Sequence, residues 1–191
     1  LGETPRKQWA VSVAPSKLDA EETVEQIIDM GYLRETAVTD EIKTLSFSPA
    51  TLHTVVYEKL PNERRKKIHG YVINFLKENA HLTELRPVDV PAAMAYHLQQ
   101  VNQFDKAAAQ RLKAGKMHIS HCDYNHAIEQ LEQGLEMANI ENLPENHKLR
   151  VSLNVKLLTA FRESGQIDRA KEILDGLPNL GKIPGSFREK V

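Results

Sequence analysis

Apolar side chains recur every three or four residues through most of the chain, a spacing that is typical of amphipathic helices. Proline, glycine and short polar runs interrupt this pattern and mark where one helix ends and the next begins. Helices are predicted over residues 49–59, 61–80, 90–101, 105–120, 124–139, 147–163 and 167–175. Glycine or proline occurs every few positions near the C-terminus, so residues 177–191 should be irregular.

The same spacing selects the residues that should face the core of each predicted helix. Positions three, four or seven apart lie on one face of a helix, so apolar side chains at these positions are expected to be buried together. In the helices before residue 102 these positions are Leu52, Val55, Val56, Ile68, Tyr71, Val72, Phe75, Leu76, Met94, Leu98 and Val101.

The pattern differs near the N-terminus. A helix is predicted over residues 19–30, capped by Asp19 and ended by Gly31. Residues 32–48 alternate apolar and polar positions on both sides of a polar turn, which predicts a β-hairpin. A shorter alternation, WAVSV at 9–13, favours a loop with one short strand. A helix followed by a hairpin is the second half of a winged helix, so the predicted fold is mainly α with a partial winged helix.

Three small residues occur where two predicted helices would cross closely. Gly115 lies on one helix, and Ala127 and Gly134 lie on the next, with the larger Leu131 between them. Helix axes approach within about 8–10 Å only where small side chains occupy the crossing. Asp123 precedes the second helix, where its side chain is placed to cap the backbone. This stretch therefore predicts an antiparallel helix pair.

These positions resemble the tetratricopeptide repeat, a helix pair that stacks into arrays. The residues that carry the resemblance are Gly115, Ala127, Leu131 and Gly134, with a second partial copy at Gly165 and Ala170. Two positions depart from the family pattern, because His118 replaces an aromatic residue and Cys122 replaces the turn glycine. The alanines at 107, 127 and 170 are 20 and 43 residues apart, whereas the family period is about 34.

The resemblance implies a TPR-like array of antiparallel helix pairs in the second half of the chain. The predicted organisation is therefore a winged-helix remnant with connecting helices over residues 1–88, helical repeats over 89–176 and a tail over 177–191. Too few residues precede the helix at 19–30 to complete a winged helix. We therefore expect the chain to be part of a larger protein.

A longer set of motifs extends from about residue 22 to 175. A helix ending in MGYL, a hairpin ending in SFSPATLHTVVYEKLP, the run ERRKKIH and the segment DYNHAIEQLEQGLE follow one another in this order. Together they resemble the region that follows the nucleotide-binding module in STAND-type signalling ATPases. The matching residues are Gly31, Leu33, Phe47, Pro49, Leu52, Tyr57, Leu60, Pro61, Arg65, His69, Ala95, Tyr96 and His97.

This second resemblance implies a regulatory arm that contacts a protein partner or the upstream nucleotide-binding domain of the same chain. In such proteins the winged helix lies against the nucleotide module, and the helical repeats sense a partner or ligand. The sequence has no G-x-x-x-x-G-K-[ST] phosphate-binding loop and no G-x-S-x-G motif. We therefore expect no ATP binding, no cofactor and no enzymatic activity.

Composition and charge narrow the possible partners. The 191 residues carry 25 basic and 26 acidic side chains, so the net charge of −1 gives no general attraction to nucleic acid or to anionic membranes. No apolar run approaches the ~20 residues of a membrane span, so no membrane partner is expected. The single cysteine cannot form an internal disulfide, which favours a reducing, cytoplasmic location.

DNA binding, as part of a transcription regulator, is the main alternative function. A DNA-reading helix presents Lys, Arg, Asn or Gln to the groove, whereas the predicted helix at 19–30 is acidic and would be repelled by phosphate. The basic run at 63–69 spreads around its helix, which favours a solvated face and a structural role for Arg65 and His69. Nucleic-acid binding is therefore not expected.

A metal-responsive module is the second alternative, because three histidines, the only cysteine and the neighbouring Asp123 occur within residues 115–130. His118 and Cys122 share a helix face, His121 lies beside them and His126 begins the next helix. Zinc accepts such ligands, but structural zinc sites usually take paired ligands from two places. The favoured interpretation is a repeat hairpin without a metal.

The most usable functional surface is the concave side of the predicted repeats. Leu112, Lys116 and Ile119 are expected to lie there and to bind a protein partner, such as an acidic or amphipathic helical peptide. The alternative is that these three residues pack against a neighbouring helix.

Overall fold

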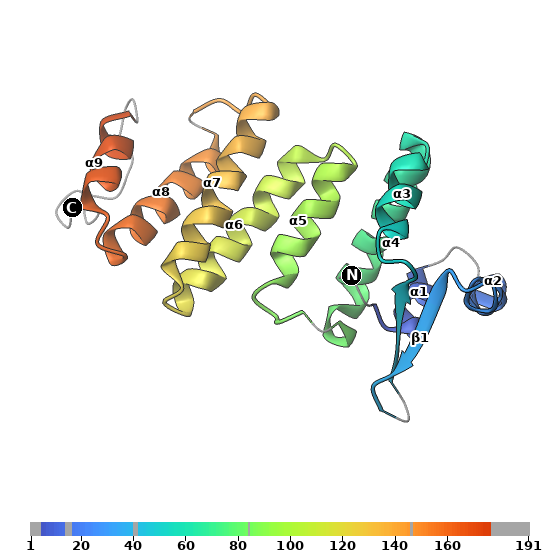
Figure 1. The fold of residues 1–191 in the computed structure, drawn as a ribbon. Helices are drawn as coiled ribbons and strands as arrows, with labels where there is room; N and C mark the ends of the chain where they lie inside the picture. The colour runs from blue at the N-terminus through green and yellow to red at the C-terminus, as the bar shows by residue number, and fades with distance from the viewer. Residues whose placement is uncertain (1–4, 14–16, 40–41, 84, 146, 177–191) are drawn as a thin grey trace. The chain divides into compact units, whose positions relative to one another are not determined.

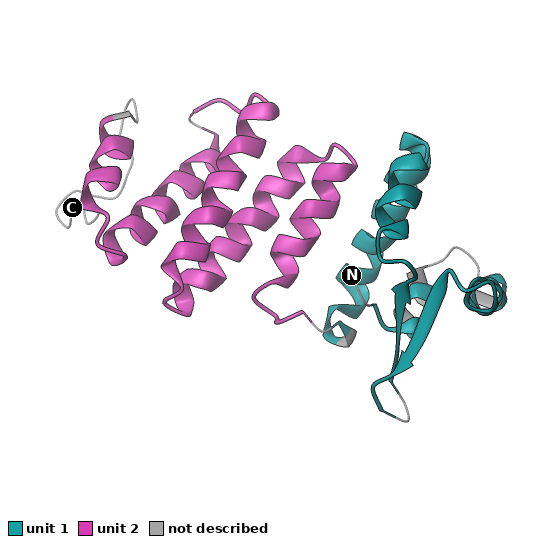
Figure 2. Cartoon of the chain, in the orientation of Figure 1, with its two compact units in different colours: residues 1–84 teal, residues 85–191 magenta. Residues whose placement is uncertain are grey.

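The chain is mainly helical, with a small antiparallel hairpin near the N-terminus (Figure 1), as the sequence predicts. It divides into two compact units, residues 1–84 and 85–191, which Figure 2 colours separately. The predicted tail, 177–191, lies outside the described residues. The structure is a computed structural model that describes residues 5–13, 17–39, 42–83, 85–145 and 147–176.

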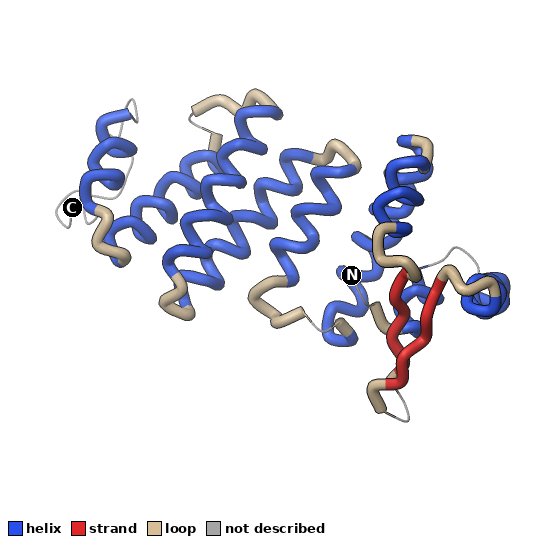
Figure 3. Tube along the Cα trace, in the orientation of Figure 1, coloured by secondary structure: helices blue, strands red, loops and turns tan. Residues whose placement is uncertain are grey.

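The first unit combines short helices with the hairpin, whose two strands are red in Figure 3. The strands pair in antiparallel register, with Leu33 opposite Phe47. The chain just before the first helix extends this hairpin, because the Leu45 N–H donates to the Pro5 carbonyl at 2.9 Å. The elements are α1 (Lys7–Val13), α2 (Lys17–Asp29), β1 (Leu33–Ala37), β2 (Lys43–Phe47), α3 (Leu52–Lys59), α4 (Asn62–Asn79) and a 3₁₀ turn, η1 (Ala80–Leu82).

Residues 9–13 are helical, so the prediction of a loop with a short strand is wrong. Helix α1 packs against α2 and α4, and its Val11 is buried. An alternation over five residues fits one turn of helix about as well as a strand, and the contacts with two other helices decide the outcome. Helix α2 begins at Lys17, so Asp19 lies in its first turn and is not the predicted cap.

Four predicted core residues of α3 and α4 are exposed, which corrects that part of the sequence analysis. Val55 and Val56 of α3 expose 49% and 43% of their surface, and Ile68 and Tyr71 of α4 expose 40% and 37%. The short helix α3 has no buried residue, so its apolar side is not part of a core in the described structure. The buried residues of α4 are His69, Val72, Ile73, Phe75 and Leu76.

The second unit consists of helices that follow one another in an up-and-down path (Figure 1). Helices that are adjacent in sequence pack against each other, and α6 also packs against α8. The observed bounds agree with the predicted ones to within one residue at each end. The elements are α5 (Val90–Gln100), α6 (Phe104–Ser120), α7 (Tyr124–Ile140), α8 (Lys148–Glu163) and α9 (Ile167–Gly176).

Each of these helices, up to α8, ends in the same backbone motif. In the turn after α6, the Cys122 N–H bonds the Ile119 carbonyl at 3.0 Å, and the Asp123 N–H bonds the His118 carbonyl at 2.9 Å. This is the Schellman motif, in which one residue takes the left-handed conformation that glycine favours. The residues in this conformation, spaced by 20, 20 and 23 positions, are Asn102, Cys122, Asn142 and Gly165.

The predicted small residues lie where the helices of this unit approach most closely. A Cβ atom added at Gly115 would lie 2.5 Å from Leu131 Cγ, and one added at Gly134 would lie 2.6 Å from Leu153 Cδ2. Gly165 differs, because it is the turn residue after α8 and has open space around it. The other predicted repeat positions, all fully buried, are Ala127, Leu131 and Ala170.

None of the helices in the described ranges is long and apolar enough to cross a membrane. This agrees with the absence of a membrane-spanning run in the sequence.

Candidate functional site

The predicted partner-binding residues lie on α6 but differ in accessibility. Leu112 is buried within the helix stack, Ile119 is half-buried and Lys116 is exposed. Of the three, Lys116 therefore offers the most accessible side chain, and Leu112 packs against its neighbours.

The exposed residues of α6 form a single stripe along the helix. Spacings of three and four residues place them on one side, because the helix repeats every 3.6 residues. The stripe, which we call the α6 lysine stripe, consists of Asp105, Lys106, Ala109, Lys113, Lys116 and Ser120, so it carries three lysines and one aspartate. The corresponding exposed positions of α7 include Glu129 and Glu136. The two helices of this pair therefore present opposite charge to solvent.

Two histidines and one aspartate converge at the turn between α6 and α7. The Nδ1 atoms of His118 and His126 lie 3.0 Å and 2.8 Å from the two separate carboxylate oxygens of Asp123. The imidazole rings stack with their centroids 5.5 Å apart and their planes at 25°. His118 is buried and His126 is exposed. Asp123 occupies the N-cap position of α7, as predicted, but its side chain makes no capping hydrogen bond.

Two residues of the alternative metal set lie outside this cluster. The His121 ring turns back along α6, where its Nδ1 lies 2.7 Å from the Met117 carbonyl oxygen. The Cys122 thiol is exposed, and its hydrogen bond with Tyr124 raises the pKa of that hydroxyl. The structure therefore brings together His118 and His126 but neither His121 nor Cys122.

The cluster is held by charge as well as by packing. The hydrogen bond from His126, with a smaller contribution from His118, lowers the pKa of the Asp123 carboxyl. The same hydrogen bond raises the pKa of the exposed His126 imidazole. Arg86 lies close enough to oppose that rise, although its guanidinium is engaged by Asp89 in two hydrogen bonds. The cluster therefore favours a protonated His126 beside an ionised Asp123.

This charge pair should stabilise the fold most between about pH 4 and pH 6.5. The raised pKa of His126 means that its contribution is complete below the unfolded value and is lost as pH rises through the folded one. The lowered pKa of Asp123 means that its contribution is lost as pH falls through its folded value. Thermal unfolding of the unaltered chain and of His126→Gln should differ at about pH 5.5 and converge at about pH 8.5. A difference that grew toward pH 8.5 would contradict this assignment.

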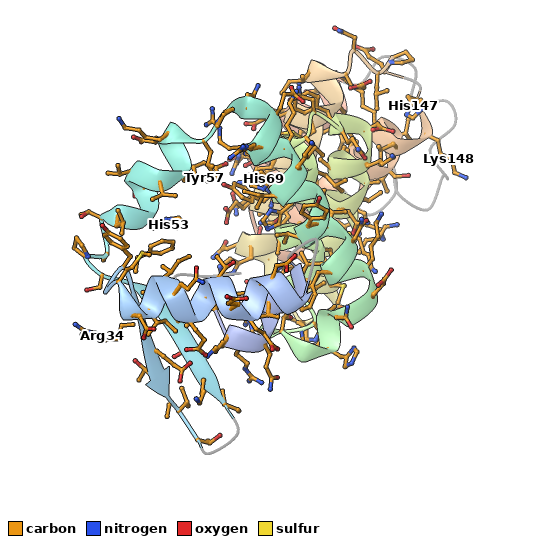
Figure 4. All side chains as sticks on the ribbon, turned by 90° about the vertical axis from the view of Figure 1, so that its right-hand side faces the viewer. Arg34, His53, Tyr57, His69, His147 and Lys148 are labelled. Carbon is orange, nitrogen blue, oxygen red and sulfur yellow. The ribbon has the colours of Figure 1, made fainter. Side chains whose placement is uncertain are left out.

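The first unit contains a second group of interacting side chains, on α3 and α4. The Tyr57 hydroxyl lies 2.8 Å from His69 Nε2, and the two side chains point toward each other in Figure 4. The Arg65 guanidinium lies over the Tyr57 ring, 5.6 Å from its centroid. The His53 ring stacks on the Tyr57 ring, with the two centroids 6.4 Å apart. Burial lowers the pKa of His69, so the ring is held neutral against the phenol.

Asp123 is one of the residues that the sequence offers as candidate metal ligands, and it is also the predicted cap of α7. The capping role is expected because Asp123 directly precedes a helix, but its carboxylate contacts the two histidines instead. Cys122, the residue before it, takes the left-handed conformation, which is hard to assign to a cysteine from sequence. A carboxylate within five residues of two histidines is the sequence signal that indicates this cluster.

Comparison of the chain with protein-family models, with curated proteins and with solved structures finds no match.

Proposed function

We propose that this chain is a non-catalytic regulatory part of a larger cytoplasmic signalling ATPase and that its helical unit binds an acidic protein segment. The observation that carries the proposal is the recurring turn, because helices that end in the same motif every 20 to 23 residues are typical of repeat arrays. Such arrays present long, regular surfaces to other proteins. The tetratricopeptide-like pattern at Gly115, Ala127 and Gly134 supports the same class.

The charge of the array favours an acidic partner. Helices α6 and α8, which pack against each other, each carry four basic side chains and one acidic side chain. Helix α7 carries three glutamates and no lysine or arginine. A partner segment with carboxylates would therefore be attracted to the α6 lysine stripe and repelled by α7. Complementary charge of this kind gives specificity and fast association.

The first unit supports the link to signalling ATPases. Tyr57, Arg65 and His69 are among the residues that carry the resemblance, and the fold brings these three side chains into contact. In this proposal they hold α3 against α4, so that the unit presents a fixed surface to the nucleotide-binding domain. The exposed Val55 and Val56 are the apolar part of that surface.

Selection from a displayed random peptide library on the immobilised chain should enrich acidic or amphipathic peptides. The double variant Lys113→Glu, Lys116→Glu should bind the selected peptides about tenfold or more weakly, because it reverses the charge of the α6 lysine stripe. Binding would be measured by fluorescence anisotropy at low and at physiological salt. Glu136→Lys is the matched control, since it reverses a charge on α7 and should not weaken binding.

Three outcomes would contradict the proposal. Selected peptides could lack acidic residues, or they could bind the stripe variant as tightly as the unaltered chain. Tight binding of duplex DNA with a steep dependence on salt would instead favour the transcription-regulator alternative. The proposed relation to signalling ATPases is tested by the full reading frame, which should encode a phosphate-binding loop upstream of these residues.

A further inference from the structure

The cluster of His118, Asp123 and His126 occupies three positions around the turn after α6. Other turns of this unit have different residues at the equivalent positions. Relative to the left-handed residue of each turn, these positions are four before, one after and four after. At the turn between α8 and α9 they are Phe161, Gln166 and Arg169, and at the turn between α5 and α6 they are Leu98, Gln103 and Lys106.

Two of the other three turns share an arrangement that stabilises the turn without metal-ligating residues, whereas the turn after α7 has Ala138 and Leu143 at the first two positions. Arg169 lies over the Phe161 ring at 4.4 Å and donates to Gln166 Oε1 at 3.1 Å. Lys106 likewise donates to Gln103 Oε1 at 3.0 Å. An apolar residue, an amide and a cation thus satisfy these two turns. The turn between α6 and α7 keeps the same contacts but replaces each member by a residue that can ligate a metal.

The ligand atoms of this cluster are already close enough for one ion. One potential ligand atom from each of His118, Asp123 and His126 can be chosen so that all lie within 4.8 Å of one another. The two nitrogen–oxygen distances, 3.0 Å and 2.8 Å, run to different oxygens of Asp123, and each is a few tenths shorter than the edge of about 3.3 Å in a tetrahedral zinc site. A small outward movement of the exposed His126 would therefore admit the ion.

We propose that His118, Asp123 and His126 form a binding site for a divalent first-row transition metal ion such as Zn²⁺. Two imidazoles and one carboxylate suit such ions, and three protein ligands leave one position for water on the exposed side. Each imidazole must present its Nδ1 lone pair, so a neutral ring carries its proton on Nε2, and a protonated His126 releases one proton to solvent. The charged neighbours are Glu129, which favours a cation, and Arg86, whose charge is offset by Asp89.

The test is titration of Zn²⁺ into metal-free protein, followed by calorimetry, with Co²⁺ absorption as a second readout. One ion should bind per chain, and Co²⁺ should show the visible bands of a four-coordinate site. Affinity should fall as the pH is lowered below about 6, because protons compete for the imidazoles. Absence of saturable binding would overturn the proposal.

The chain supplies variants that should keep the turn folded. His118→Phe, Asp123→Gln and His126→Arg each copy the residue found at the turn between α8 and α9, and each should weaken binding by about tenfold or more. His121→Ala and Cys122→Asn should leave binding unchanged, since neither side chain belongs to the cluster. Thermal unfolding of each variant without metal reports whether it folds. Loss of binding in His121→Ala, or retention in Asp123→Gln, would overturn the assignment.

Discussion

Gly115→Ala should lower the unfolding free energy of the second unit by about 1–3 kcal/mol, although alanine is the better helix former. The added Cβ would lie 2.5 Å from Cγ and 2.7 Å from Cδ2 of Leu131. Leu131 is fully buried at the crossing of α6 and α7, so its side chain cannot move aside without disturbing other contacts. Urea unfolding followed by circular dichroism would measure the loss.

A double-mutant cycle separates this clash from other effects of the substitution. In a Leu131→Ala background the atoms that meet the new Cβ are gone, so Gly115→Ala should cost much less than it does alone. Gly70→Ala is the control, because a Cβ at Gly70 of α4 meets nothing within 4 Å. That change should stabilise its helix by up to about 1 kcal/mol. Equal effects at Gly70 and Gly115 would refute the close crossing.

Phe161→Ala should destabilise the second unit by about 3–5 kcal/mol, the largest loss expected from a single truncation in this chain. Phe161 is 1% exposed and belongs to the largest fully buried side chains. Its removal leaves a cavity beneath α9 and takes away the ring over which the Arg169 guanidinium lies. Chemical unfolding at several temperatures would give the change in free energy.

Two variants of α9 distinguish the cavity from the loss of the cation–π contact. Arg169→Gln keeps the Phe161 ring and removes the cation, so its cost should remain below about 1 kcal/mol. Ile167→Ala truncates an exposed apolar side chain on the same helix and should have little effect. If Arg169→Gln lowered the free energy of unfolding as much as Phe161→Ala does, the Phe161 ring would stabilise the fold through the cation–π contact and not through packing.

Sequence periodicity predicts the second unit well because its helices are long and its turns are short. Over 16 or 17 residues in each of α6, α7 and α8, the apolar positions define one face without ambiguity. In α1 only seven residues are available, so the pattern does not separate helix from strand. In α3 the apolar pattern is present, yet Val55 and Val56 are exposed, because periodicity does not show whether another element packs on the apolar face.

The candidate site is less predictable from sequence than the fold. The cluster of His118, Asp123 and His126 depends on the left-handed conformation of Cys122 and on a side chain that turns away from the helix it precedes. His121 lies nearer to His118 in sequence than His126 does, but its ring bonds the backbone of its own helix. Ligand geometry of this kind follows from single dihedral angles, which spacing alone does not determine.

The regular turns of the second unit have a consequence for how it folds. Each helix contacts mainly the helices next to it in sequence, so the contacts that form its core join residues about 20 positions apart. Chains with such local contacts fold rapidly and without a long search. Among the described residues, α9 packs mainly against α8 and α6 packs most extensively against α7. We therefore expect α9 to open before the α6–α7 pair, whose amide protons should exchange most slowly.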